Sequence, residues 1–172
     1  MAKFWNFVLF QAGWFACVLG AAHHQTFWAV SGSLAYIAFY IWRSSNPRQE
    51  FNLLAKVLLY GIATDTLIMY LGVLDFRDAW PSPLLSPAWM WALWLLVAST
   101  LNGSMSWLRK SPILASVLGA VCGPVSYEAG VRLGAANWGY GGQILGFCLI
   151  GVVWAIAMPL FFYWDRTRIK GV

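Results

Sequence analysis

The sequence predicts an all-α membrane protein, a polytopic helical bundle of about six transmembrane helices with both termini in the cytoplasm (N-in/C-in). Of its 172 residues, 60% are hydrophobic and only 10% are charged, against about 25% charged in a soluble domain. The apolar residues form six runs, each near the roughly twenty residues that a helix needs to cross a bilayer. No gap between the runs is long enough to be a linker, so a single transmembrane domain is expected over residues 1–172.

The six runs are expected to be consecutive antiparallel helices, because the gaps between them are short. The first resembles a signal peptide, but its apolar run is long and its removal would spoil the charge pattern, so we expect a retained helix. Ser111 and Pro112 suit the start of the fifth, as N-cap and first-turn residues. The expected spans are 4–22, 26–42, 52–74, 88–108, 112–135 and 144–164.

The positions of Lys and Arg predict the orientation, because cytoplasmic loops carry an excess of basic residues. With the N-terminus inside, Arg77 and Arg132 lie outside, and loop 75–87 with its three prolines is an outer loop. Many of the twelve Trp fall near the ends of the runs, as in an interfacial belt, and an aromatic ligand pocket is the alternative. Nine basic residues lie on the cytoplasmic side: Lys3, Arg43, Arg48, Lys56, Arg109, Lys110, Arg166, Arg168 and Lys170.

A stripe of small residues runs along one face of the fifth expected helix. At about 100° per residue, this glycine stripe comprises Ala115, Gly119, Gly123, Ser126, Gly130 and Gly134. Its two G-x-x-x-G pairs would let a second helix approach closely in the membrane. The stripe is therefore expected to be a helix-packing face. Its partner is either a helix of the same chain or another protein, including a second copy.

Ionisable residues inside the apolar runs mark a candidate site. Glu128 and Arg132 lie one helical turn apart, opposite the glycine stripe, and Asp65 lies in the outer half of the third run. A charge facing lipid costs about 3 kcal/mol or more at mid-depth. We therefore expect Glu128 and Arg132 to face the bundle interior, with Asp65 near enough to join them. The alternative is a simple ion pair near the outer interface, with the arginine extending outward.

Two further residues complete the expected ligand-binding set of a site in the outer half of the membrane. Tyr127 precedes Glu128, and Asn102 lies on the polar face of the fourth run, deeper toward the cytoplasm than the others. Pro124, one turn before Glu128, frees the carbonyl group of Ala120 and can open the helix beside the site. The full set is Asp65, Asn102, Tyr127, Glu128 and Arg132.

Other chemistries find little support in the sequence. His23 and His24 are the strongest candidate metal ligands, but their spacing does not match a metal site, so no metal and no cofactor are predicted. The three cysteines lie in apolar runs and are expected to be small buried hydrophobic residues. The net charge of +5 comes from short gaps and not from a basic stripe, which argues against nucleic acid as a partner. No known catalytic motif assigns the chain to an enzyme class.

The stretch GPVSYEAGVRLGA at 123–135 resembles the G-P-x-S-Y-x-A-G-x-x-L-G-A motif of a family of small bacterial inner-membrane proteins, catalogued as a domain of unknown function. A tryptophan-rich helix precedes the motif in that family, as residues 89–108 do here. The resemblance assigns no catalytic or binding residue. The family's gene neighbours imply a link to membrane-lipid modification or to light and oxidative stress. The tryptophan-rich sensory family is similar in size, but its proline- and tryptophan-rich loop motif is absent. The matched positions are Gly123, Pro124, Ser126, Tyr127, Gly130, Leu133 and Gly134.

Three classes of function are consistent with these observations. The first is a small protein of the bacterial inner membrane whose polar intramembrane site binds a lipid or another amphipathic molecule. The second is an accessory subunit, held to a membrane-protein partner or to a second copy through the glycine stripe. The third is a proton-coupled transporter using Asp65 and Glu128. A cavity lined by these two carboxylates would favour the first or the third class, and membrane lipids are the expected partners in the first.

Overall fold

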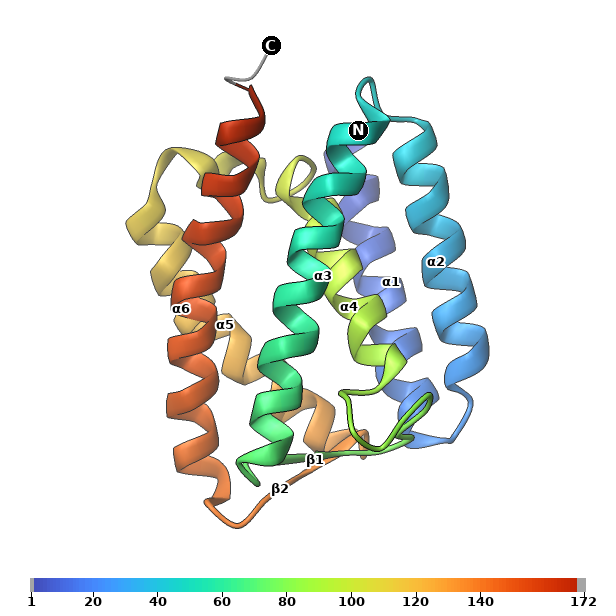
Figure 1. The fold of residues 1–172 in the computed structure, drawn as a ribbon, viewed down its shortest axis with the longest axis vertical. Helices are drawn as coiled ribbons and strands as arrows, with labels where there is room; N and C mark the ends of the chain where they lie inside the picture. The colour runs from blue at the N-terminus through green and yellow to red at the C-terminus, as the bar shows by residue number, and fades with distance from the viewer. Residues whose placement is uncertain (1, 170–172) are drawn as a thin grey trace.

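The computed structural model describes the backbone of residues 2–169 and the side chains of residues 3–165. Within that range the chain forms six α-helices, one short 3₁₀-helix (η1) and two short strands, arranged as a bundle (Figure 1). The prediction of an all-α chain with six helices is therefore confirmed. The elements are α1 Ala2–Ala22, α2 Thr26–Trp42, α3 Pro47–Tyr70, β1 Leu74–Phe76, α4 Ala88–Leu101, η1 Ser106–Lys110, α5 Pro112–Arg132, β2 Ala136–Trp138 and α6 Gly142–Ile169.

Four of the helices, α1, α3, α5 and α6, are long and apolar enough to cross a membrane. Large hydrophobic side chains remain exposed on the outer faces of the bundle, among them Phe4, Leu59, Val117 and Val152. Water-exposed apolar surface of this extent is rare on a soluble monomer. The chain is thus a small multi-pass membrane protein.

Helix α4 is the centre of the bundle. It packs against α1, α2, α3 and α6, and eleven of its fourteen residues are buried. A helix that is hydrophobic on every side belongs in the interior, which explains the run of Trp, Leu and Ala in its sequence. Its length of about 21 Å, at 1.5 Å per residue, is less than the thickness of the hydrocarbon core.

The expectation of a helix over 88–108 is wrong at its end, because α4 stops at Leu101. Asn102 and Gly103 are poor helix formers, and Asn6 of α1 meets the chain where it turns. The Asn6 amide donates to the Ser99 carbonyl group at 3.2 Å, and its oxygen accepts from the backbone N and the hydroxyl of Ser104, both at 2.9 Å. The Asn6 side chain thus supplies hydrogen bonds that the backbone would have made itself if α4 had continued.

The two strands pair antiparallel, with Leu74 opposite Trp138 and Phe76 opposite Ala136. No strands were expected here. The third run was predicted to continue as helix to 74 and the fifth to 135, with loops after them. Gly134 has a φ of +87°, and the amide of Ala135 bonds back to the Gly130 carbonyl group at 2.9 Å. This is the left-handed helix ending that glycine favours. Gly134 therefore ends α5, and this backbone conformation accounts for a glycine at the position.

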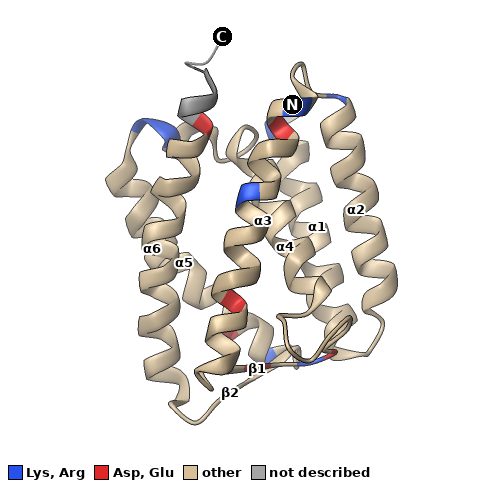
Figure 2. Ribbon diagram, in the orientation of Figure 1, with Lys and Arg blue, Asp and Glu red and all other residues tan. Residues whose placement is uncertain are grey.

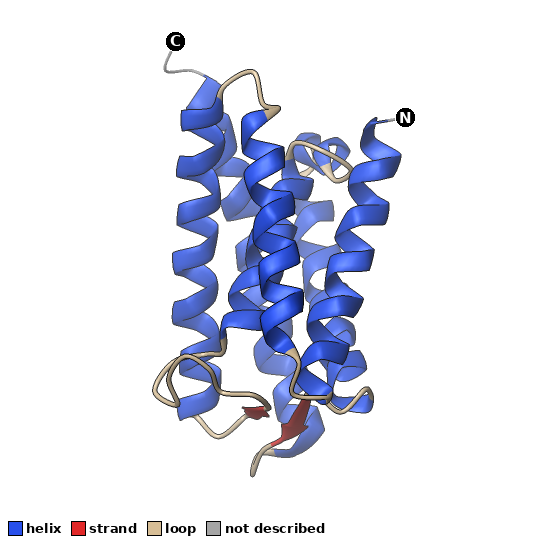
Figure 3. Ribbon diagram, turned by 90° about the vertical axis from the view of Figure 1, so that its right-hand side faces the viewer, coloured by secondary structure: helices blue, strands red, loops and turns tan. Residues whose placement is uncertain are grey.

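Charge is distributed very unevenly along the bundle. Basic segments gather at the end that holds both termini, which we name the basic end, and the middle is nearly free of charge (Figure 2). Arg77 and Arg132 lie at the opposite end, where the strands lie across the ends of the helices (Figure 3). Arg166, Arg168 and Lys170, which were expected at the cytoplasmic side, fall outside the described side chains.

The glycine stripe divides into parts with different surroundings. A Cβ atom at Gly119 or Gly123 would lie closer than 3.0 Å to Trp154 of α6, and the α5–α6 pair has the most extensive contact in the molecule. The partner of this part of the stripe is therefore a helix of the same chain. A Cβ atom at Gly130 would meet nothing within 4 Å, so Gly130 has no close packing partner among the described residues, and its expected packing role would need a partner outside this chain.

Candidate functional site

Asp65 is the deepest charged group of the α3 segment, with no exposed surface. Its two carboxylate oxygens have different partners. Oδ2 accepts from the indole N–H of Trp94 on α4 at 2.6 Å, and Oδ1 accepts from the hydroxyl of Tyr127 on α5 at 2.6 Å. Buried polar groups are normally hydrogen-bonded, and here one carboxyl group joins three helices. Asp65 and Tyr127, two residues of the expected ligand-binding set, are thus in direct contact.

The indole of Trp94 is held by close packing on both faces. It stacks on Trp154, with ring centroids 4.7 Å apart and planes at 11°. Its other face lies against Gly61 of α3, where any Cβ atom would collide with the ring. The edges of Tyr60 and Phe161 pack around it. These contacts leave the indole N–H one direction, toward Asp65, so the carboxylate is positioned by a rigid aromatic cluster.

A cavity of about 650 Å³ adjoins this aromatic cluster, and Trp94, Tyr127 and Trp154 form part of its lining. We name it the cleft. It lies between α1 and α5, with α4 and Trp154 of α6 at its base, and no charged side chain of the described residues lines it. Gln11, Ser104, Ser126 and Tyr127 supply most of its polar groups. Apolar lining residues include Phe10, Trp14, Leu93, Val97, Val121 and Val125.

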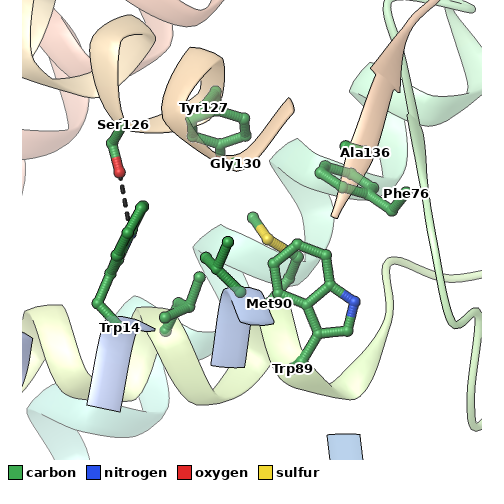
Figure 4. Close-up of a pocket in the computed structure, with 10 residues that line it drawn as sticks. Trp14, Phe76, Trp89, Met90, Ser126, Tyr127, Gly130 and Ala136 are labelled. Atoms are coloured by element: carbon green, nitrogen blue, oxygen red, sulfur yellow. Dashed lines mark hydrogen bonds between the residues drawn. The ribbon is translucent and has the colours of Figure 1, made fainter. Parts of the chain in front are cut away.

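A second, much smaller hollow of about 30 Å³ adjoins the cleft (Figure 4). Trp14, Met90, Ser126 and Tyr127 line both spaces. The indole N–H of Trp14 donates to the Ser126 hydroxyl at 3.0 Å, linking α1 to α5 across the gap. Gly130 lines the small hollow, which explains why a side chain there would have room. The hydrogen bond between α1 and α5 lies at the end of the cleft nearer the two strands, since Phe76 of β1 and Ala136 of β2 line the same small hollow.

Glu128 and Arg132 form an ion pair away from Asp65. Arg132 Nε donates to Glu128 at 2.6 Å, and the Trp138 indole of β2 donates to the other Glu128 oxygen at 2.9 Å. The Arg132 side chain is 76% exposed and that of Glu128 15%. The expectation that Arg132 faces the bundle interior is therefore wrong. Consecutive residues of a helix point about 100° apart, so Tyr127 faces inward where Glu128 faces the strand.

Asn102 lies at the basic end, far along α4 from the residues that contact Asp65. It donates to both oxygens of Glu50, at 3.1 and 3.3 Å, and accepts from Arg109, which also pairs with the buried Asp165. Tyr40 donates to Glu50 at 3.3 Å. This network joins α2, α3, α4, η1 and α6. Glu50 and Asp165 were not predicted as part of a polar network, because both lie at the ends of apolar runs, where charged residues are ordinary.

The histidines and cysteines are the remaining candidate residues. His23 and His24 are exposed in the turn after α1, and the described residues contain no group of three His, Cys, Asp or Glu that would hold a metal ion. Cys17 is buried as expected, whereas Cys122 and Cys148 are exposed on the apolar faces of α5 and α6. Cys122 lines the cleft.

Comparison with known proteins identifies the family of this chain. The sequence model of a family described as a protein of unknown function (DUF2878) matches residues 3–160. The chain belongs to this family. No curated protein and no solved structure matches the chain. The resemblance expected from the late GPxSYxAGxxLGA motif is thus confirmed at the level of the family, and its residues Gly123, Ser126 and Tyr127 all line the cleft.

Proposed function

We propose that the protein binds the apolar part of a lipid or other amphipathic molecule in the cleft between α1 and α5. The observation that carries this proposal is the cavity of about 650 Å³ without charged lining residues. This volume falls within the roughly 300–1,000 Å³ range of small-molecule sites, which are mostly apolar with a few placed polar groups. Exposed valines of α5, Val121 and Val125, form its rim, so a molecule dissolved in the bilayer can enter sideways.

The proposal includes a location in the bacterial inner membrane with both termini in the cytoplasm. The gathering of basic segments at the end with both termini supports it (Figure 2), because Lys and Arg accumulate on the cytoplasmic side. The polar site is then the part of the wall formed by Trp94 and Tyr127, and Asp65 lies behind the wall, bonded to both side chains. A role in a membrane-lipid-modification or stress-related pathway is the functional context that we propose.

Orientation is tested by cysteine labelling in a background without the native cysteines. Ser82→Cys in the loop between β1 and α4 is expected to react with a membrane-impermeant thiol reagent in intact cells. Ser45→Cys in the exposed turn between α2 and α3 is the matched control and is expected to react only after lysis. The reverse pattern would contradict the N-in/C-in orientation.

Filling the cleft should displace its occupant. Val121 and Val117 are exposed valines one turn apart on α5, at 58% and 53%, and only Val121 of the two lines the cleft. Native mass spectrometry of protein extracted with its own lipids is expected to show bound lipid in the wild type and in Val117→Trp. Val121→Trp is expected to reduce occupancy by about tenfold or more, which corresponds to about 1.4 kcal/mol. Equal occupancy in the two variants would contradict the proposed site.

A further inference from the structure

We infer that the cleft takes a lipid with an anionic headgroup from the cytoplasmic leaflet, with the headgroup at Lys3 and Lys110. The inference rests on the proposed function, since it names the class of lipid that occupies the same cleft. It is carried by two exposed lysines that lie one turn beyond lining residues at the basic end of a cleft whose lining contains no charged side chain of the described residues.

Both lysines share a helix face with a cleft residue at the basic end. Lys3 lies four residues before Phe7 on α1, and residues at this spacing lie on the same face of an α-helix. Lys110 lies three residues after Trp107 on η1, and side chains at this spacing eclipse in a 3₁₀-helix. Phe7 and Trp107 both line the cleft, so each lysine extends it toward the water.

The start of α1, which carries Lys3, contacts the turn that leads into η1, which carries Lys110. Asn6 accepts hydrogen bonds from the backbone and the hydroxyl of Ser104, both at 2.9 Å, which holds the start of α1 against the turn before η1. Neither Lys3 nor Lys110 forms an ion pair with any residue whose side chain the structure describes. Arg109, which precedes Lys110, pairs with Asp165 and donates to Asn102. Lys3 and Lys110 are therefore two cations at this end of the bundle that no described side chain neutralises.

The length of the cleft matches one leaflet. Its lining runs from Phe7 to Phe15 on α1 and from Leu118 to Ala129 on α5, about 12 and 16 Å at 1.5 Å per residue. This is about half of the roughly 30 Å hydrocarbon core. At the far end, Arg132 is occupied by Glu128 and lies outside the cleft lining. An acyl chain therefore fits with its headgroup at the basic end, where the lysines attract a negative charge.

The test compares two lipids with identical acyl chains, phosphatidylglycerol and phosphatidylcholine, binding to the purified full-length protein in detergent by native mass spectrometry. The wild type is expected to bind the anionic lipid on the order of tenfold more tightly. In Lys3→Gln/Lys110→Gln the preference should fall to near unity, with the affinity for phosphatidylcholine unchanged. The control Arg43→Gln/Arg48→Gln removes two exposed charges at the same end, in the α2–α3 turn, and should keep the preference.

Two results would overturn the inference while leaving the proposed function intact. One is equal binding of the two lipids by the wild type. The other is an equal loss of preference in the lysine and the arginine variants, which would assign it to the general charge of the basic end. Binding of neither lipid by the wild type, or unchanged binding of both by Val121→Trp, would instead contradict the proposed function itself. Melting temperatures near that of the wild type would establish that the variants are folded.

Discussion

Leucine in place of Gly119 is expected to destabilise the protein by about 3 kcal/mol or more. A Cβ atom at this position would lie closer than 3.0 Å to the backbone carbonyl group of Trp154 and to the side chain of Met158. A side chain can rotate away from an intruding group, but the backbone of α6 cannot move without separating the α5–α6 pair. The melting temperature in detergent should fall steeply, or no folded protein should be recovered.

Gly32 provides the matched control for this substitution. It is exposed on α2, and a Cβ atom there would meet nothing within 4 Å. Gly32→Leu introduces the same side chain into a helix of the same protein and is expected to change the melting temperature little. Gly130→Ala should likewise be tolerated, because it projects into open space. Similar losses at Gly119 and Gly32 would show that the packing face of α5 has been misassigned.

The second large effect is expected at Asp65. Alanine in its place would leave the Trp94 indole N–H and the Tyr127 hydroxyl without their acceptor inside the bundle. A buried donor that loses its partner costs about 1–3 kcal/mol, so the two donors together predict a loss on the order of 3 kcal/mol. Asparagine retains one acceptor oxygen and should cost less than alanine. Thermal unfolding in one detergent measures both variants.

A double-mutant cycle isolates the contribution of the hydrogen bond itself. In Asp65→Ala/Tyr127→Phe the hydroxyl that lost its acceptor is also removed, so part of the stability lost in Asp65→Ala should return. Strictly additive losses would contradict a direct bond between the two side chains. If Asp65→Asn folds normally but no longer binds lipid, then lipid binding in the cleft depends on the Asp65 carboxylate, as a proton-linked function would require.

Helix existence could be predicted well from this sequence, whereas helix ends could not. Each of the six apolar runs contains one helix, because an apolar segment in a bilayer must satisfy its own backbone hydrogen bonds, and four of the six are long enough to cross a membrane. The end of α4 depends on Asn6, which lies 93 residues from its partner Ser99. The β1–β2 pair similarly joins segments on either side of two helices. Neither contact leaves a periodic signal in the sequence around the residues that it affects.

The candidate site was predictable in part and for a physical reason. An unpaired carboxylate inside an apolar run needs partners, which singled out Asp65. The identity of those partners depended on helix rotation, and a rotation of one residue separates Tyr127 from Glu128. Glu128 and Arg132 were included because they are charged. Residues at this spacing can pair with each other in any helix, however, and they need no partner inside the bundle. The indoles of Trp94 and Trp14 had no predicted role, because a hydrogen bond to another helix leaves no pattern in the sequence, and the structure gives each a specific hydrogen bond.

The most direct test of the central claim is a crystal structure of the protein purified with its native lipids. The account predicts elongated density for an acyl chain between α1 and α5, in contact with Trp14, Val121 and Val125, while Trp94 and Tyr127 remain bonded to Asp65. A structure in which α1 and α5 close on each other, with their side chains filling the space between them, would contradict it.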